Sequence, residues 1–281
     1  MRRKMTDSAL GLLGPPAFLK EREPVPDFIT LEPDGGLYGP YFERFASFFG
    51  TGGLVAVHAA GRSREAVWDS LQRKEVYGTS GDRILLWFDL LDEESGERVP
   101  MGSSLSRIEN PRFEVNAVGA FMQKPGCPAD SLRALSADRL QRLCGGECYH
   151  PGDERKAIER IEVVRIRPQQ RAGEPVHELV DDPWKVLPCE PGGTTCTVRF
   201  HDPEFAAGQR DALYYVRAIQ QASPTVNGAQ LRCEQDETGQ CVKVDPCSVS
   251  GAIAYEDDCL AAAQERAWSS PIFVDYGSIG P

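Results

Sequence analysis

The order of apolar and polar positions predicts a strand, a helix and a second strand between residues 54 and 81. The run Leu54–Ala59 is apolar apart from His58, which is typical of a strand buried on both faces. Ser63 is a suitable N-cap for the helix that follows. Glu75–Tyr77 predicts the second strand, and Gly78–Gly81 predicts a turn. The apolar positions expected to face inward from the helix are Val67, Leu71 and Trp68.

After Gly81 the pattern changes to short segments rich in strand formers, several of them alternating with period two. Such strands, separated by turns and long polar loops, predict a mainly antiparallel β-sandwich with one inserted helix over Leu132–Leu143. Before Gly52, proline and glycine predict loops, with one short helix near Tyr41–Phe49. The expected strands of the sandwich are Ile84–Leu90, Phe113–Val118, Ile158–Ile166, Thr195–Phe200, Leu213–Ile219 and Pro271–Val274.

Composition restricts the class of partner. The 281 residues have a net charge of −11, which argues against nucleic-acid binding, because phosphate backbones need a basic surface. No apolar run is long enough to span a membrane. The charge does not argue for or against a small-molecule substrate.

The nine cysteines are the strongest signal in the composition. Cys127 stands apart, and the other eight are close neighbours in pairs, although sequence cannot fix their connectivity. Disulfides are one interpretation of these cysteines, and reduced structural thiols are another. A zinc site is the third interpretation, and it is disfavoured because the spacings are scattered and no Cys-x-x-Cys occurs. The disulfide candidates are Cys144 with Cys148, Cys189 with Cys196, Cys233 with Cys241 and Cys247 with Cys259.

Disulfides predict a periplasmic or extracellular location. The first residues, Met1–Asp7, are basic but lack the apolar core of a signal peptide. We therefore expect the native start to lie further upstream; a cytoplasmic protein with inert thiols is the alternative.

Three segments carry a family resemblance. They are Gly52–Arg83, then Asp202–Phe205 with Tyr214–Ala218, and finally Gln264–Ile272. In this order they resemble the C-terminal part of a bacterial family catalogued as domain of unknown function 3604 (DUF3604), which is similar to the polymerase-and-histidinol-phosphatase (PHP) metallohydrolases. The resemblance implies an α+β fold class: residues 1–81 as the remnant of a PHP-like α/β barrel, and residues 82–281 as a β-sandwich with disulfide-stapled loops.

Divalent metals, either Mn, Zn or Fe, are the cofactors that the resemblance implies for an intact family protein. Such centres need several convergent imidazole and carboxylate ligands. The chain has only His58, His150, His177 and His201, no two of them at ligand spacing. No metal ligand can therefore be assigned here, and the implied metal motifs and upstream barrel segment would precede Met1.

The candidate substrate-binding residues are His58, Arg62 and Arg64. His58 ends the predicted strand, where sites in such barrels collect, and the arginines flank a helix N-terminus suited to anions. A rim histidine and a solvated first turn are the alternative interpretations. The other three histidines are expected in surface loops of the sandwich.

Two functions remain open. One is the inactive C-terminal fragment of an exported PHP-like metal-dependent hydrolase, with phosphoesters among its conceivable small-molecule substrates. The other is a stand-alone, non-catalytic binding or structural module outside the cytoplasm. Whether the chain is itself an enzyme stays undecided by its sequence.

Overall fold

The computed structural model describes residues 52–92, 96–144, 148–226, 233–238, 240–244 and 260–277. The chain divides into two compact units, and each is considered by itself. The larger unit contains residues 53–222 and 264–281, and the smaller contains residues 1–52 and 223–263. The predicted helix near residues 41–49 lies outside the described residues.

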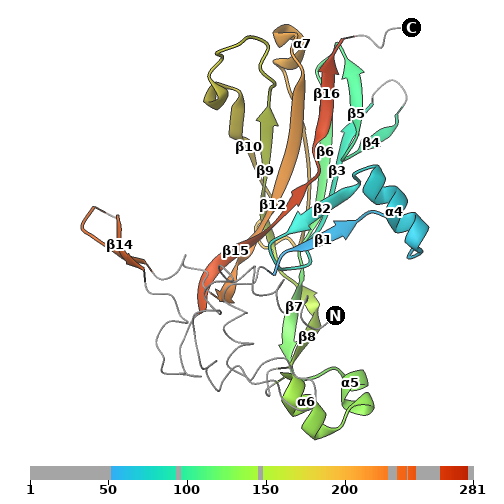
Figure 1. Ribbon diagram of the computed structural model, residues 1–281, viewed down its shortest axis with the longest axis vertical. Helices are drawn as coiled ribbons and strands as arrows, with labels where there is room; N and C mark the ends of the chain where they lie inside the picture. Colours follow the sequence, from blue (N-terminus) through green and yellow to red (C-terminus); the bar gives the residue numbers. More distant parts are fainter. Residues whose placement is uncertain are drawn as a thin grey trace, which may run out of the picture. The chain divides into compact units, whose positions relative to one another are not determined.

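The larger sheet has the order β1-β2-β15-β12-β16-β5, and β9 pairs with β12 and β10 with β9 (Figure 1). The pairs β1–β2, β2–β15, β12–β16, β9–β12 and β9–β10 are antiparallel, whereas β16 and β5 are parallel. β12 and β15 each extend into residues of the smaller unit. The eight strands are β1 Leu54–Val57, β2 Val76–Thr79, β5 Ser104–Arg107, β9 Ile158–Ile166, β10 Val180–Pro188, β12 Ala212–Val226, β15 Leu260–Ser269 and β16 Ile272–Tyr276.

The second sheet has four antiparallel strands in the order β11-β6-β3-β4. Side chains of alternate residues point to opposite faces of a strand. In β3 this places Leu86, Phe88 and Leu90 in the core, whereas Trp87, Asp89 and Leu91 face away from it. The strands are β3 Leu85–Leu91, β4 Arg98–Pro100, β6 Arg112–Val118 and β11 Thr195–His201.

Aromatic rings from both sheets meet in one core. The ring of Phe113 lies 4.9 Å from that of Phe200, 5.4 Å from that of Phe88 and 4.8 Å from that of Tyr214, which belongs to the other sheet. Burial of such side chains is the main stabilising contribution to the fold. The prediction of a mainly antiparallel β-structure is confirmed.

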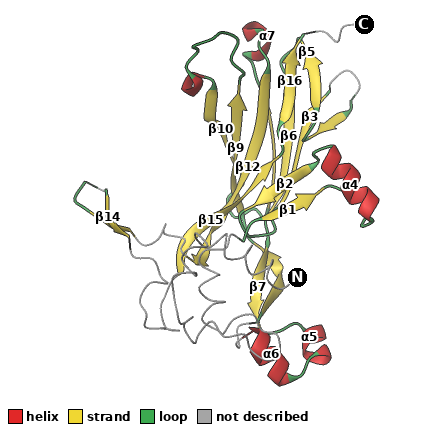
Figure 2. Cartoon of the chain, viewed as in Figure 1, coloured by secondary structure: helices red, strands yellow, loops and turns green. Residues whose placement is uncertain are grey.

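Helices are few and short (Figure 2). The expected helix over residues 132–143 is two helices, because the backbone of Leu135 is extended. Among the described helices, none is long and apolar enough to cross a membrane. The remaining elements are α4 Arg64–Gln72, α5 Ala129–Ala134, α6 Ala137–Cys144, η2 Val176–Glu178, α7 Phe205–Gly208, the hairpin of β7 Phe121–Pro125 with β8 Tyr149–Arg155, and the hairpin of β13 Cys233–Gln235 with β14 Cys241–Val244.

The segment before Gly81 differs from its prediction in burial. β1 ends the strand order and pairs only with β2, so Leu54 and Val55 are 43% and 71% exposed, and the prediction of a strand buried on both faces is wrong. Ser63 caps α4 as predicted, since its Oγ accepts from the Ala66 N–H at 3.1 Å. Ser70 is the buried residue of α4. The side chains of Trp68 and Leu71 in α4, which were expected to face inward, are exposed.

The predicted boundary near Gly81 lies inside the larger unit. β2 pairs with β15 through Thr79 and Ala267, and Ser80 hydrogen-bonds Glu265. β1 and β2 are antiparallel, whereas successive strands of an α/β barrel are parallel. Among the described strands no barrel closes, so the expected barrel remnant is not confirmed.

The prediction of disulfides is confirmed, with one correction. Cys189 joins Cys196, but Cys127, which stands apart in the sequence, joins Cys148. The β7–β8 hairpin causes this pairing, because it brings the end of β7 beside the start of β8, where Gly126 N–H donates to the Cys148 carbonyl. The side chains of Cys144, Cys233 and Cys241, and residues Cys247 and Cys259 entirely, lie outside the described part.

Candidate functional site

His58, Arg62 and Arg64 do not meet in a pocket. His58 Nε2 lies 2.9 Å from the Leu86 carbonyl oxygen; because a carbonyl only accepts, Nε2 carries the hydrogen in this contact. The His58 ring also lies 5.7 Å from the ring of Trp87. Arg62 and Arg64 are exposed at the start of α4. His58 thus ties the end of β1 to the second sheet.

A pocket of about 220 Å³ lies on the second sheet. Leu91 of β3, Arg112 of β6 and His201 of β11 form one cross-strand row on the face turned away from the core. Arg199, two residues before His201, lies on the same face. Phe113 and Phe200 back the pocket, with rings that belong to the core.

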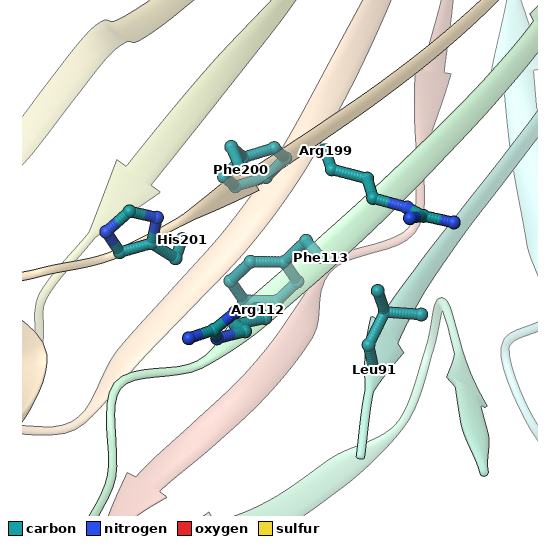
Figure 3. Close-up of a pocket in the computed structure, with 6 residues that line it drawn as sticks. All are labelled: Leu91, Arg112, Phe113, Arg199, Phe200 and His201. Carbon is teal, nitrogen blue, oxygen red and sulfur yellow. The ribbon is translucent and has the colours of Figure 1, made fainter. Parts of the chain in front are cut away.

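In the view of Figure 3, Arg112 and His201 lie on one side of the phenylalanine rings, and Arg199 and Leu91 lie on the other. The two phenylalanine rings are buried, because Phe113 and Phe200 alternate along their strands with the outward-facing Arg112, Arg199 and His201. The ionisable side chains in the lining are Arg112, Arg199 and His201, and the Glu114 carboxylate pairs with Arg199 beside it.

Glu114 fixes the guanidinium of Arg199. Its carboxylate lies 2.6 Å from Arg199 Nε and 2.6 Å from Arg98 Nη1, and it accepts a third bond from Asn116 at 3.2 Å. The carboxylate is buried, with only 4% of the side chain exposed. The bonds from Arg98 and Arg199 lower the pKa of Glu114 to about 2, so it stays ionised. Burial instead raises the pKa of the neighbouring Asp89.

The second segment of the family resemblance forms a buried ion network. Arg165 Nη1 contacts both oxygens of Asp202, at 3.0 and 3.2 Å, and the Tyr214 hydroxyl donates to Asp202 at 2.7 Å. The guanidinium also binds Asp181 and lies 4.5 Å from the Trp184 ring. Burial raises the pKa of Tyr214 and keeps it protonated. These groups bind one another across β9, β12 and the loop after β11, and so hold the fold.

The histidines that the structure describes do not converge as the ligands of a PHP-type metal centre would. Within the described part, no group of three or more His, Cys, Asp or Glu side chains could hold a metal ion. The four histidines belong to separate places: His58 follows β1, His150 binds the Gly126 carbonyl from β8, and His177 is in η2. His201 lies beside two arginines, whose charge opposes cation binding.

The pocket was not predicted from the sequence. The prediction that His201 lies in a loop is wrong, because His201 ends β11. The available signal was the spacing of Arg199 and His201, since residues two apart in a strand share a face. Nothing in the sequence indicated that Arg112 would lie opposite His201.

Comparison with known proteins gives one family. The chain matches the profile described as "Protein of unknown function (DUF3604)" over residues 38–276. No curated protein and no solved structure matches it. The match covers most of the chain and all three segments of the resemblance. The chain therefore belongs to the DUF3604 family.

Proposed function

We propose that this chain is a non-catalytic β-sandwich part of an exported PHP-like metal-dependent hydrolase, and that it supports the enzyme structurally. The metal-bearing part and the small-molecule substrate, with phosphoesters among the candidates, would belong to a longer family protein. The resemblance to PHP hydrolases expected from the sequence supports the activity, and the contacts of the larger unit support the division of roles.

The observation that carries this proposal is that polar side chains of the family segments bind other residues of the fold. Asp202 and Tyr214 bind Arg165, and Ser80 binds Glu265 across the β2–β15 pair. Carboxylates saturated by arginine and hydroxyl donors are poor metal ligands and poor general bases, because their charge is already compensated. A structural role explains why these residue types occur in these segments.

The purified 281-residue chain should contain no stoichiometric manganese, zinc or iron and should not hydrolyse phosphomonoesters or phosphodiesters. Metal analysis by mass spectrometry, before and after incubation with each ion, and turnover of a chromogenic phosphodiester test this. Metal-dependent turnover that disappears with a chelator would refute the non-catalytic role.

A stand-alone binding module is the second candidate, favoured by the pocket on the second sheet. The mass of the native product in its source cells separates the two. A product well above 30.9 kDa supports the hydrolase part, and one of 30.9 kDa supports the stand-alone module.

A periplasmic or extracellular location is proposed from the two disulfides, since such bonds persist in oxidising compartments. With four of the nine cysteines joined, at most five thiols can be free. We expect about one free thiol per native chain, because the remaining five can form two further pairs. Thiol titration of the native product, denatured without reductant, measures this; close to nine free thiols would instead indicate the cytoplasm.

A further inference from the structure

We propose that β1 is the contact strand of a dimer. A second copy of the chain adds its own β1, antiparallel and about a twofold axis, to the edge of β1 that lies opposite β2 (Figure 1). The two larger sheets then form one continuous sheet. This inference goes beyond the proposed function and does not depend on whether the chain serves a hydrolase.

The free edge of β1 has a defined set of hydrogen-bonding groups. The His58 N–H donates to the Glu75 carbonyl at 2.9 Å, and because bonds alternate along an antiparallel pair, Ala56 also faces β2. The backbone N–H and C=O groups of Val55 and Val57 therefore point away from β2. Within the described part of the chain, no strand pairs with β1 on that side. The edge thus offers two donors and two acceptors to another strand.

The sequence of β1 lacks the residues that protect an edge strand. Natural edge strands avoid pairing with other chains by means of charged side chains or proline. β1 has the sequence Leu-Val-Ala-Val and contains neither. The other described edge strands of the two large sheets all contain at least one such residue, for example Arg107 in β5, Pro183 in β10, Pro100 in β4 and Arg199 in β11. Among these edges, β1 is therefore the one suited to pair with another chain.

Apolar side chains beside this edge are open to solvent. Val55 and Leu54 are exposed, and α4, which contacts β1, has the exposed side chains of Trp68 and Leu71. Burial of apolar surface favours association. The backbone bonds formed when a strand is added to a sheet edge contribute further affinity.

A second copy fits this edge because β1 is complementary to itself. With a twofold axis at Ala56, Val55 of one copy lies opposite Val57 of the other, and each such pair forms two hydrogen bonds. Opposed valines are also a favourable cross-strand pair. Residues 54–61 contain no Lys, Arg, Asp or Glu, so the net charge of −11 causes no repulsion at the contact. Both copies use the same edge, so the assembly closes at two chains.

The first test is the mass of the intact 281-residue chain as a function of its concentration. Sedimentation analysis should show the mass rising from 30.9 kDa toward twice that value. The dissociation constant should be on the order of 10–100 μM, as suits a small interface. A chain that stays monomeric up to about 1 mM would overturn the proposal.

Hydrogen exchange of the wild-type chain identifies the strand that pairs. The amide protons of Val55 and Val57 should exchange several-fold more slowly above the dissociation constant than well below it, because only the dimer bonds them. The amide of Ala56 is the internal control and should change less, since β2 already bonds it in the monomer. Dimerisation that leaves the Val55 and Val57 amides unchanged would also overturn the proposal.

Val55→Lys should weaken dimerisation at least about tenfold, because the dimer would have to bury two added charges at its edge. Val186→Lys is the matched control, since it makes the same change at an exposed valine of the edge strand β10, and it should dimerise as the wild type does. Thermal unfolding checks that both variants are folded. Equal dissociation constants for the wild type and a folded Val55→Lys variant would refute the contact. If Val55→Lys fails to fold, the hydrogen-exchange comparison still decides, because it uses the wild-type chain alone.

Discussion

Replacement of Asp202 by alanine should lower the free energy of unfolding by about 3–5 kcal/mol, the range for removing one partner of a buried ion pair. Asp202 is 1% exposed and compensates the charge of Arg165, which is itself buried. The substitution also leaves the Tyr214 hydroxyl without its acceptor. Urea denaturation followed by tryptophan fluorescence measures the loss.

Glu204→Ala is the matched control for this prediction. Glu204 contacts the same Nη1 of Arg165 at 2.9 Å, but 68% of its side chain is exposed. Solvent screening limits such a contact to less than about 1 kcal/mol. Equal losses in Asp202→Ala and Glu204→Ala would show that burial does not set the strength of this network.

Glu114→Gln should reduce the stability of the protein at neutral pH and have little effect near pH 2. The pKa of Glu114 is lowered from 4.5 to about 2 in the folded protein. A lowered pKa contributes stability above the unfolded-state value, and that contribution is lost as pH falls from about 5 toward 2. We expect about 1–2 kcal/mol at pH 7, allowing for the exposure of Arg98 and Arg199.

The measurement is the difference in unfolding free energy between wild type and variant at several pH values. Asp153→Asn is the control, since its pKa is also lowered, by Lys124, but the carboxylate is fully open to solvent. It should show no comparable pH-dependent loss. The role of the ionised Glu114 carboxylate would be contradicted by one result. This is a difference in unfolding free energy between wild type and Glu114→Gln that stays constant from pH 7 to pH 2.

The sequence pattern predicted those strands that have one face in the core and the other face nearer to solvent. The alternation in Phe113–Val118 and Ile158–Ile166 corresponds to β6 and β9, because one face of each strand packs in the core. The run Leu54–Ala59 gave a wrong prediction of burial, because apolar residues alone do not distinguish a central strand from an edge strand such as β1. β10 and β15 were not predicted, since polar residues such as Asp181 and Glu265 interrupt their patterns.

The pocket depends on contacts that local pattern does not encode. Arg112 and His201 are neighbours only because β6 and β11 pair in one register. A shift by one residue would move His201 to the core face. The same reason explains Cys127: its partner Cys148 follows from the β7–β8 pairing and not from proximity in sequence.

The pairing of β2 with β15 has a consequence for synthesis of the chain. Ser80 and Glu265, which hydrogen-bond beside this pair, are 185 residues apart. At about 5–20 residues per second, β2 leaves the ribosome roughly 10–40 s before its partner strand exists. During that interval its backbone donors and acceptors on that edge are open to other strands, so nascent chains are at risk of aggregation until the last segment is translated. A chaperone that holds unfolded chains would protect them, and a secretion route that accepts unfolded polypeptide would avoid any need to fold before export.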